Sequence, residues 1–257
     1  MKLDTIITGD SAEVLKTFPD ACIDLTVTSP PYDNLRTYNG FTFDFETIAH
    51  ELFRVTKAGG VVVWVVGDAT ANGSETGTSF RQALYFMQCG FNLHDTMIYE
   101  KAGCAFPSSN RYNQIFEYMF IFSKDKPKTS NLIKDKKNKW AGQSTFGNSS
   151  NRQKDGTIKS FGKRIIKDVG LRNNIWRYAN GNGFGQKDKS AYSHPATFPE
   201  QLANDHILSW SNEGDTVLDC FCGSGTTPKM ARLANRHYVG IETSAEYVEL
   251  ANKRIND

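Results

Sequence analysis

The sequence predicts an α/β protein with a doubly wound, mostly parallel sheet. Two regions of the 257-residue chain alternate short β-rich runs with amphipathic helical patterns, as successive βαβ units do. The notable loop motifs directly follow β-rich runs, where a doubly wound sheet binds its ligands. Hydrophobic residues make up 39% of the chain, which suits one large domain or a domain with a modest insertion.

The first region covers residues 1–122. Its expected elements, in chain order, are a strand at 23–28, an amphipathic helix at 44–60 closed by glycine, a buried strand at 61–68, a helix at 79–91, and strands at 93–101 and 115–124. The last two strands are candidates for an antiparallel pair.

The second region, taken as residues 191–257, repeats the pattern. Its expected elements are a helix at 198–211 with Pro199 in the first turn, a strand from 215 that runs into a glycine-rich turn, a helix that ends near 235, a strand at 237–242, and a helix from its N-cap Ser244 to 255.

Residues 123–190 separate these regions and carry 17 Lys and Arg against 5 Asp and Glu, although the whole chain has a net charge of only +2. A basic stretch rich in Gly, Asn and Ser is typical of a solvated linker. Interspersed aromatic residues are instead typical of nucleic-acid surfaces, and this segment holds Trp140, Phe146, Phe161, Trp176, Tyr178 and Phe184. The charge predicts an anionic partner, and the aromatic residues favour a nucleic acid.

The composition argues against several other classes of protein. No run approaches the roughly 18 apolar residues of a membrane helix, and acidic residues stand where a signal peptide would be apolar. We therefore expect a cytoplasmic protein that makes no membrane contact. The cysteines are scattered and odd in number, which predicts buried thiols in place of disulfides or a metal site; they are Cys22, Cys89, Cys104, Cys220 and Cys222.

The stretch "VLDCFCGSGTT" joins a strand to a glycine-rich turn. Asp219 ends the strand, and Gly223 and Gly225 allow a tight turn with close backbone approach to a ligand. Glu242 ends the next strand, where a carboxylate can accept both hydrogen bonds of a ribose diol. The pair indicates an adenosine-containing cofactor. A dinucleotide is the alternative, but the turn lacks the full GxGxxG pattern.

The stretch "TSPPY" ends the first predicted strand abruptly. Two prolines after Ser29 stop the hydrogen-bonding ladder and fix the backbone. The loop then offers the Ser29 hydroxyl and the Pro30 carbonyl as acceptors beside the flat ring of Tyr32, which suits an –NH2 group on a planar ring. A proline turn with a packed tyrosine is the alternative interpretation.

"TSPPY" resembles the catalytic loop of the amino-DNA methyltransferases, which methylate the exocyclic amine of cytosine (N4) or adenine (N6). In that family "LDCFCGSGTT" is similar to the cofactor glycine loop, "GIETS" to the ribose-binding acid, and "HPATFPEQL" to the segment around the methionine end of S-adenosylmethionine. The resemblance covers residues 5–124 and 194–255. The catalytic loop comes first and the glycine loop last, which is the order of the beta class.

The resemblance implies a Rossmann-like S-adenosylmethionine-dependent methyltransferase fold with permuted motif order. Residues 1–122 and 191–257 would form the catalytic and cofactor-binding domain, and residues 123–190 a target-recognition insertion. Within that insertion, base edges would be read by some of Arg152, Arg164, Arg172, Asn173 and Arg177.

The family motifs assign roles residue by residue. The implied catalytic residues are Ser29, Pro30, Pro31 and Tyr32. The implied cofactor-binding residues are Asp10, His194, Pro195, Ala196, Phe198, Asp219, Phe221, Gly223, Ser224, Gly225, Thr226, Thr227 and Glu242. No metal is implied. Asp10 is equally explained as a helix N-cap, and His194 as a capping or packing residue.

Two positions depart from the usual family pattern. Cys220 stands where proline is frequent, and "HPATFP" replaces the more common HPTQKP, which weakens any role for Phe198.

The implied reaction is direct methyl transfer from S-adenosylmethionine to a flipped-out base in double-stranded DNA. Serine at the start of the loop is more frequent among cytosine-N4 enzymes and aspartate among adenine-N6 enzymes, so the sequence favours cytosine and keeps adenine as the alternative. An RNA or protein methyltransferase and an inactive nucleic-acid-binding homologue are further alternatives. A cognate restriction endonuclease and a homodimer are compatible with the family.

Overall fold

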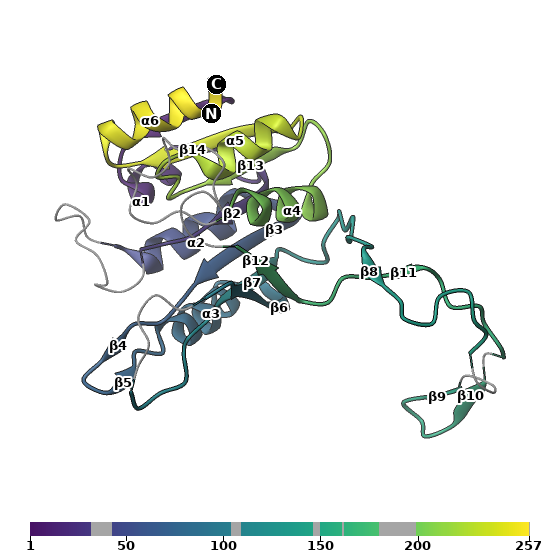
Figure 1. Cartoon of the computed structure of the whole chain (residues 1–257). Helices are drawn as coiled ribbons and strands as arrows, with labels where there is room; N and C mark the ends of the chain where they lie inside the picture. Colours follow the sequence, from purple (N-terminus) through teal and green to yellow (C-terminus); the bar gives the residue numbers. More distant parts are fainter. Residues whose placement is uncertain (32–42, 104–108, 146–149, 161, 180–198, 257) are drawn as a thin grey trace. The chain divides into compact units, whose positions relative to one another are not determined.

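The computed structural model describes residues 1–31, 43–103, 109–145, 150–160, 162–179 and 199–256 (Figure 1). The chain divides into two compact units. One consists of Met1–Asn131 with Asn174–Asp257, and the other of Leu132–Asn173. These limits differ from the predicted boundaries after residues 122 and 190.

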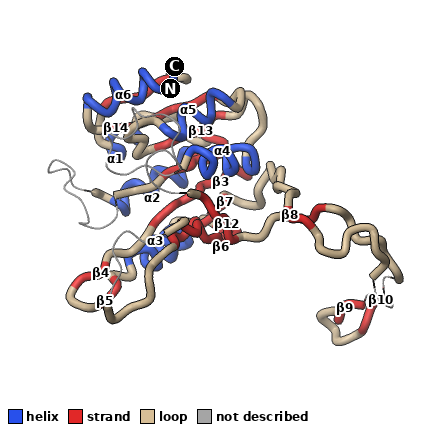
Figure 2. Tube along the Cα trace, viewed as in Figure 1, coloured by secondary structure: helices blue, strands red, loops and turns tan. Residues whose placement is uncertain are grey.

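The larger unit is built on an eight-stranded sheet (Figure 2). Across the sheet its strands are β1 (Thr5–Thr8), β14 (His237–Glu242), β13 (Thr216–Asp219), β2 (Ile23–Thr28), β3 (Thr56–Val66), β7 (Phe116–Ser123), β6 (Asn92–Lys101) and β12 (Ile175–Tyr178). Among these described strands, β7 alone runs antiparallel to its neighbours. The predicted α/β class, the mostly parallel sheet and the antiparallel β6–β7 pair are confirmed.

Helices cover both faces of this sheet (Figure 1). The helices are α1 (Ser11–Lys16), α2 (Phe45–Val55), α3 (Thr78–Gln88), α4 (Glu200–Trp210), α5 (Thr226–Leu233) and α6 (Ala245–Asn256). Helices α1, α2 and α3 pack in one layer, and α4, α5 and α6 pack in the other. The sheet is therefore doubly wound. Within the described ranges, every helix is too short or too polar to span a membrane.

The boundary between α2 and β3 lies earlier than predicted. Thr56 takes an extended backbone conformation and its hydroxyl donates to the Leu52 carbonyl (2.6 Å), so the helix ends at Val55. The chain then pairs at once with its neighbours: the Gly59 N–H donates to the Lys124 carbonyl (2.6 Å) at a left-handed φ of 78°. Residues 56–60, predicted as the end of a helix, thus begin the strand.

Strand β12 belongs to the sheet although the sequence placed it in the basic region. Trp176 is 7% exposed and its ring lies against that of His206, with 4.6 Å between centroids. The Tyr178 hydroxyl donates to the Asp205 carboxylate (2.7 Å). These contacts with α4 fix the strand. Burial lowers the pKa of His206 to about 3, so its imidazole is neutral in the folded protein.

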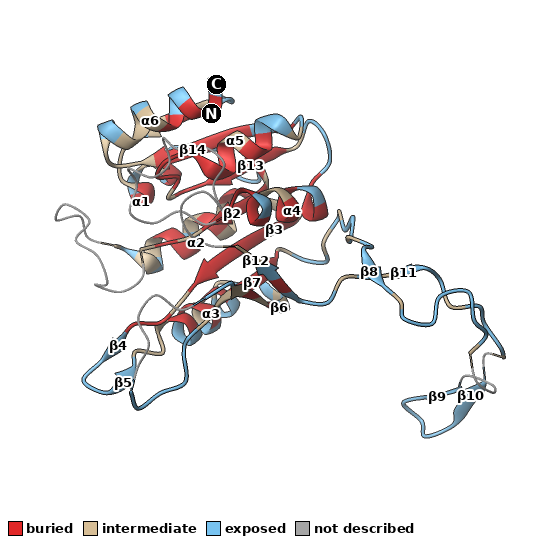
Figure 3. Ribbon diagram, in the orientation of Figure 1, coloured by how far each residue is buried: buried red, intermediate tan, exposed pale blue. Residues whose placement is uncertain are grey.

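The core under α2 and α3 is aromatic and almost fully buried (Figure 3). Trp64 of β3 is 0% exposed and makes edge contacts with Phe86 and Phe221. Its indole N–H donates to the Gln82 side-chain oxygen (2.9 Å) in the same buried layer. Because Phe221 lies just before the glycine-rich turn, this core also supports the edge of the sheet where that turn lies.

Replacing Gln82 with leucine should destabilise the protein. The substitution leaves the buried Trp64 N–H without its acceptor, which costs about 1–3 kcal/mol of unfolding free energy. Urea unfolding monitored by circular dichroism measures this loss. Gln88→Leu, at the exposed end of the same helix, is the matched control and should change stability by less than about 0.5 kcal/mol. Equal effects of the two substitutions would contradict the assignment.

Four cysteines lie in the described ranges and are free thiols. Cys220 and Cys222 are buried, and Cys22 and Cys89 are half-buried. Cys104 lies outside the described residues. The described part of the chain shows no cluster of three or more His, Cys, Asp and Glu side chains that suits a metal ion.

The smaller unit contains two short antiparallel strand pairs. Its strands pair as β8 (Lys136–Lys137) with β11 (Val169–Gly170) and β9 (Ser150–Arg152) with β10 (Ile158–Ser160). None of its described hydrophobic residues is buried, and Trp140, Ile158 and Ile165 are more than half exposed. The unit therefore has no hydrophobic core among the residues described.

The larger unit also contains a short hairpin after β3, in which β4 (Thr70–Ala71) pairs with β5 (Ser74–Glu75).

Candidate active site

Four parallel strands of the larger unit end at one edge of the sheet. Strands β1, β14, β13 and β2 are neighbours in this order, and their registers bring their carboxyl ends together. Asp10 follows β1, Glu242 ends β14, Asp219 ends β13, and Ser29 follows β2. The structure thus collects the predicted residues that it describes at a single edge.

A buried hydrogen bond joins the ends of β2 and β13. The Thr28 hydroxyl donates to Asp219 Oδ1 at 2.6 Å, and both side chains are at most 2% exposed. The same Asp219 oxygen accepts the Phe221 N–H (3.1 Å), and the Thr227 hydroxyl donates to the Val27 carbonyl (3.1 Å). The residue before Ser29 is thereby fixed to the start of the glycine-rich turn.

The glycine-rich turn has little freedom to take other residues. Gly225 has a left-handed φ of 79°, and a Cβ there would lie 2.8 Å from Ala251 Cβ of α6. Gly223 also has a positive φ, of 48°. The Gly223 N–H donates to Glu242 Oε2 at 2.9 Å, so the turn is held against the end of β14.

Glu242 and Asp10 use their carboxylates to order backbone N–H groups. The other Glu242 oxygen, Oε1, accepts the Ser244 N–H (2.9 Å) at the start of α6. Asp10 accepts the N–H groups of Ala12 and Glu13 (2.9 and 3.2 Å), so it is the N-cap of α1, as one of its two interpretations stated. The Gly9 N–H donates to the Glu242 carbonyl (2.9 Å), which keeps the two acids on neighbouring strands.

Comparison with known proteins decides the family. A family model described as DNA methylase matches residues 23–253. The orphan methyltransferase M.BamHII of Bacillus amyloliquefaciens is 62% identical over 239 residues, which are 93% of this chain and 90% of its own length. The chain belongs to the N6/N4 amino-DNA methyltransferase family.

Solved structures place this amino-DNA methyltransferase in the expected fold. The PvuII DNA methyltransferase, described as cytosine-N4-specific, aligns with a TM-score of 0.70 at 22% identity, over 98% of this chain and 86% of its own. A DNA modification methylase of Thermus thermophilus, complexed with S-adenosyl-L-methionine, aligns with a TM-score of 0.66 at 26% identity, over 98% and 92% of the two chains. The fold is that of an S-adenosylmethionine-dependent methyltransferase, and S-adenosylmethionine is the cofactor.

The residues at the sheet edge of the methyltransferase fit this cofactor chemically. Glu242 Oε1 accepts the Ser244 N–H and the Thr243 hydroxyl (3.3 Å), whereas Oε2 accepts the Gly223 N–H and keeps a second lone pair that can take a ribose hydroxyl. Glu242 is half-buried. Bound S-adenosylmethionine supplies an electrophilic methyl group on a positively charged sulfur.

Several predicted residues of the methyltransferase contact other parts of the protein. Asp219 accepts from Thr28 and Phe221, and Ser224 is 2% exposed with its hydroxyl against α6. The Thr227 hydroxyl is directed to β2. Their side chains shape the turn from behind, so any contact that they make with the cofactor is expected through the backbone.

The remaining predicted residues divide by what the structure describes. Ser29 and Pro31 are half-buried and Pro30 is buried, directly after β2. Phe221 is half-buried, and its ring is edge-on to that of Phe43, with 5.4 Å between the ring centroids. Five predicted residues lie outside the described residues: Tyr32, His194, Pro195, Ala196 and Phe198.

Sequence reasoning missed the side chains that hold this site together. Thr28 stands in "TVTSPPY" as an ordinary β-branched strand residue, and its position directly before Ser29 is the signal that could have found it. Arg254 and Glu200 lie on different helices and are 54 residues apart in the sequence, so no local sequence pattern predicts their contact.

Asp219 should make the stability of the methyltransferase pH-dependent. Burial raises the pKa of Asp219 to about 6, although hydrogen bonds from Thr28 and the Phe221 N–H oppose that rise. The folded state then binds more protons than the unfolded state between the unfolded pKa near 4 and the folded value, so this group gives more stability as the pH falls through 6.

Asp219→Asn removes this dependence while keeping an oxygen that can accept from Thr28. The unfolding free energy of the wild type minus that of Asp219→Asn should rise by about 1–3 kcal/mol between pH 7 and pH 4.5. Chemical denaturation at a series of pH values measures it. A difference that stays constant over this range would show that the carboxyl titrates normally.

Proposed function

We propose that this protein transfers a methyl group from S-adenosylmethionine to the N4 amine of a cytosine flipped out of double-stranded DNA. The observation that carries the proposal is the Thr28–Asp219 hydrogen bond, 2.6 Å long, between the loop that would hold the amine and the turn that would hold the cofactor. A shared rigid anchor suits a reaction in which two bound groups must meet with little freedom.

The loop chemistry suits an exocyclic amine. Such an amine is a poor nucleophile because its lone pair is delocalised into the ring. Acceptance of its two N–H groups by the Ser29 hydroxyl and the Pro30 carbonyl favours a tetrahedral nitrogen and stabilises the positive charge that builds there. Tyr32 would stack on the flipped base, an interaction worth about 1–3 kcal/mol. No covalent bond between the enzyme and the base is needed.

The choice of base rests on Ser29. This first loop residue is serine, as is more frequent in cytosine-N4 members of the family, and it is neutral where an aspartate would be charged. The same geometry would serve adenine N6, which is the alternative substrate.

The smaller unit supplies the surface proposed for DNA. Residues 132–173 carry 11 Lys and Arg against 3 Asp and Glu. Trp140 is 55% exposed with the Lys139 ammonium 5.2 Å from its ring centroid, a pairing that suits phosphate and base contacts together. The absence of buried hydrophobic residues among those described in this unit suits a segment whose main contacts are with the DNA.

Two of the predicted base-reading residues instead hold this unit together. Arg172 forms an ion pair with Asp135, and Asn173 accepts a hydrogen bond from Lys136 (3.0 Å). Base reading in this unit is proposed for Arg152 and Arg164. In the larger unit it is proposed for Arg177, whose side chain is 67% exposed and whose Nε lies 3.7 Å from Glu100 Oε1, a longer ion pair than that of Arg172.

The biological setting is part of the proposal. M.BamHII, 62% identical to this chain, is described as an orphan methyltransferase, which favours methylation without a dedicated restriction endonuclease. We propose that the protein acts in the cytoplasm, as the monomer or as a homodimer, on double-stranded DNA.

Expression in a host that lacks DNA methylation tests the function. Sequencing of the host DNA by a method that separates N4-methylcytosine from N6-methyladenine should find N4-methylcytosine at one recurrent sequence. N6-methyladenine at that sequence would overturn the choice of cytosine. Labelled methyl groups found in tRNA or protein and never in DNA would overturn the DNA substrate.

Ser29→Ala is the control for this experiment. The variant should lose the methylated base almost completely, because the amine loses one acceptor, while its affinity for S-adenosylmethionine stays within about twofold of the wild type. Full methylation by Ser29→Ala would show that the Ser29 hydroxyl has no role in the mechanism.

A further inference from the structure

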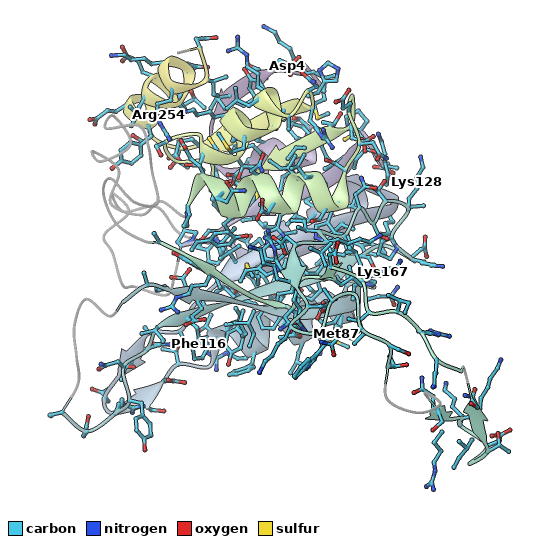
Figure 4. The ribbon with its side chains drawn as sticks, turned by 45° about the vertical axis from the view of Figure 1, so that its right-hand side comes forward. Asp4, Met87, Phe116, Lys128, Lys167 and Arg254 are labelled. Carbon is cyan, nitrogen blue, oxygen red and sulfur yellow. The ribbon has the colours of Figure 1, made fainter. Side chains whose placement is uncertain are left out.

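Arg254 of α6, labelled in Figure 4, is a buried arginine that contacts the glycine-rich turn. Its side chain is 0% exposed, which is unusual because an unpaired buried charge is costly. The groups that compensate for this burial therefore indicate what the residue does.

The Arg254 guanidinium donates mainly to the turn itself. Nη1 donates to the Ser224 carbonyl (2.5 Å) and to the Ser224 hydroxyl (2.9 Å), and it lies 3.5 Å from the Thr226 hydroxyl. These two residues flank Gly225, which packs directly on Ala251, one helical turn before Arg254. The turn is thus held by α6 through Arg254 and Ala251.

A second bond extends from Arg254 to the start of α4. Nη2 donates to Glu200 Oε1 (3.3 Å), which also accepts from the Lys229 ammonium of α5 (3.1 Å). Glu200 is the first residue of α4 and lies within "HPATFPEQL", the stretch that resembles the family's methionine-end segment. One side chain therefore connects the turn to the end of that segment.

The N-terminus of α5 does not by itself explain the positive charge of Arg254 at this position. Arg254 lies near the first turn of α5, where the partial positive charge of the helix disfavours a second positive charge. Its partners include the Ser224 carbonyl and the Glu200 carboxylate, and a guanidinium can bind both because its N–H groups form a rigid fork.

We propose that Arg254 is a positioning residue that holds the glycine-rich turn in its cofactor-binding shape. The inference rests on the assignment of residues 223–227 to S-adenosylmethionine. Arg254 sets the Ser224 carbonyl and the start of α4 before the cofactor arrives, so the turn needs no reordering on binding. It does not touch the reacting atoms and should affect affinity, leaving the transfer step unchanged.

Arg254→Lys tests the proposal because a lysine keeps the charge but cannot bridge Ser224 and Glu200 with two nitrogens. Calorimetry should show that the Kd for S-adenosylmethionine rises about tenfold, because the loss of one charged hydrogen bond corresponds to a change of that size. The kcat at saturating cofactor and DNA should stay within about twofold.

Arg236→Lys is the matched control. Arg236 is also a buried arginine, and it donates to the Ser211 carbonyl (2.8 Å) and hydroxyl (3.1 Å) after the other end of α4. This variant should lose comparable stability in thermal unfolding and keep the wild-type Kd for the cofactor. Equal losses of affinity in both variants, or a normal Kd in Arg254→Lys, would overturn the positioning role.

Glu200→Gln gives a second test if Arg254→Lys does not fold. It retains the shape of the side chain but weakens its bond with Arg254, and the Kd should rise with kcat unchanged; an unchanged Kd would overturn the proposal. Failure of the wild type to bind S-adenosylmethionine is a different result, because it would overturn the assignment of the turn itself.

Discussion

The hydrogen bond between Thr28 and Asp219 is the constraint on which the site depends. It joins the last residue of β2 to the last residue of β13, and each of these residues directly precedes a loop with a proposed chemical role. Both side chains are buried where they make this bond, and that burial raises the pKa of Asp219 to about 6. Burial of the Asp219 carboxylate therefore costs electrostatic free energy, but it lets one carboxyl group fix two loops.

The other contacts of the glycine-rich turn complete this arrangement from different directions. Glu242 accepts the Gly223 N–H from β14, and Arg254 donates to the Ser224 carbonyl from α6. The turn is therefore held from β13, β14 and α6, all elements of the larger unit. Such a turn can bind a cofactor without reordering, which avoids the entropy that a flexible loop would lose on binding.

Much of the larger unit follows from local sequence patterns. Helical and β-rich periodicity identified β2, α3, β6, β7, β14 and α6 close to their observed limits, and family motifs identified the residues at the sheet edge. Periodicity failed where tertiary contacts decide: residues 56–60 form strand because β2 and β7 pair with them, and β12 joins the sheet through Trp176 and α4. Thr28 and Arg254 escaped notice because burial of a polar side chain is set by distant partners.

The most direct test compares two identical substitutions on one strand. Thr26, like Thr28, is 0% exposed on β2, but its hydroxyl has no hydrogen-bond partner among the described residues. Thr28→Val should lower the single-turnover rate of DNA methylation about tenfold or more and weaken cofactor binding, because both loops lose their shared anchor. Thr26→Val should leave both quantities near the wild-type values. If Thr28→Val behaves like Thr26→Val, the hydrogen bond does not organise the site.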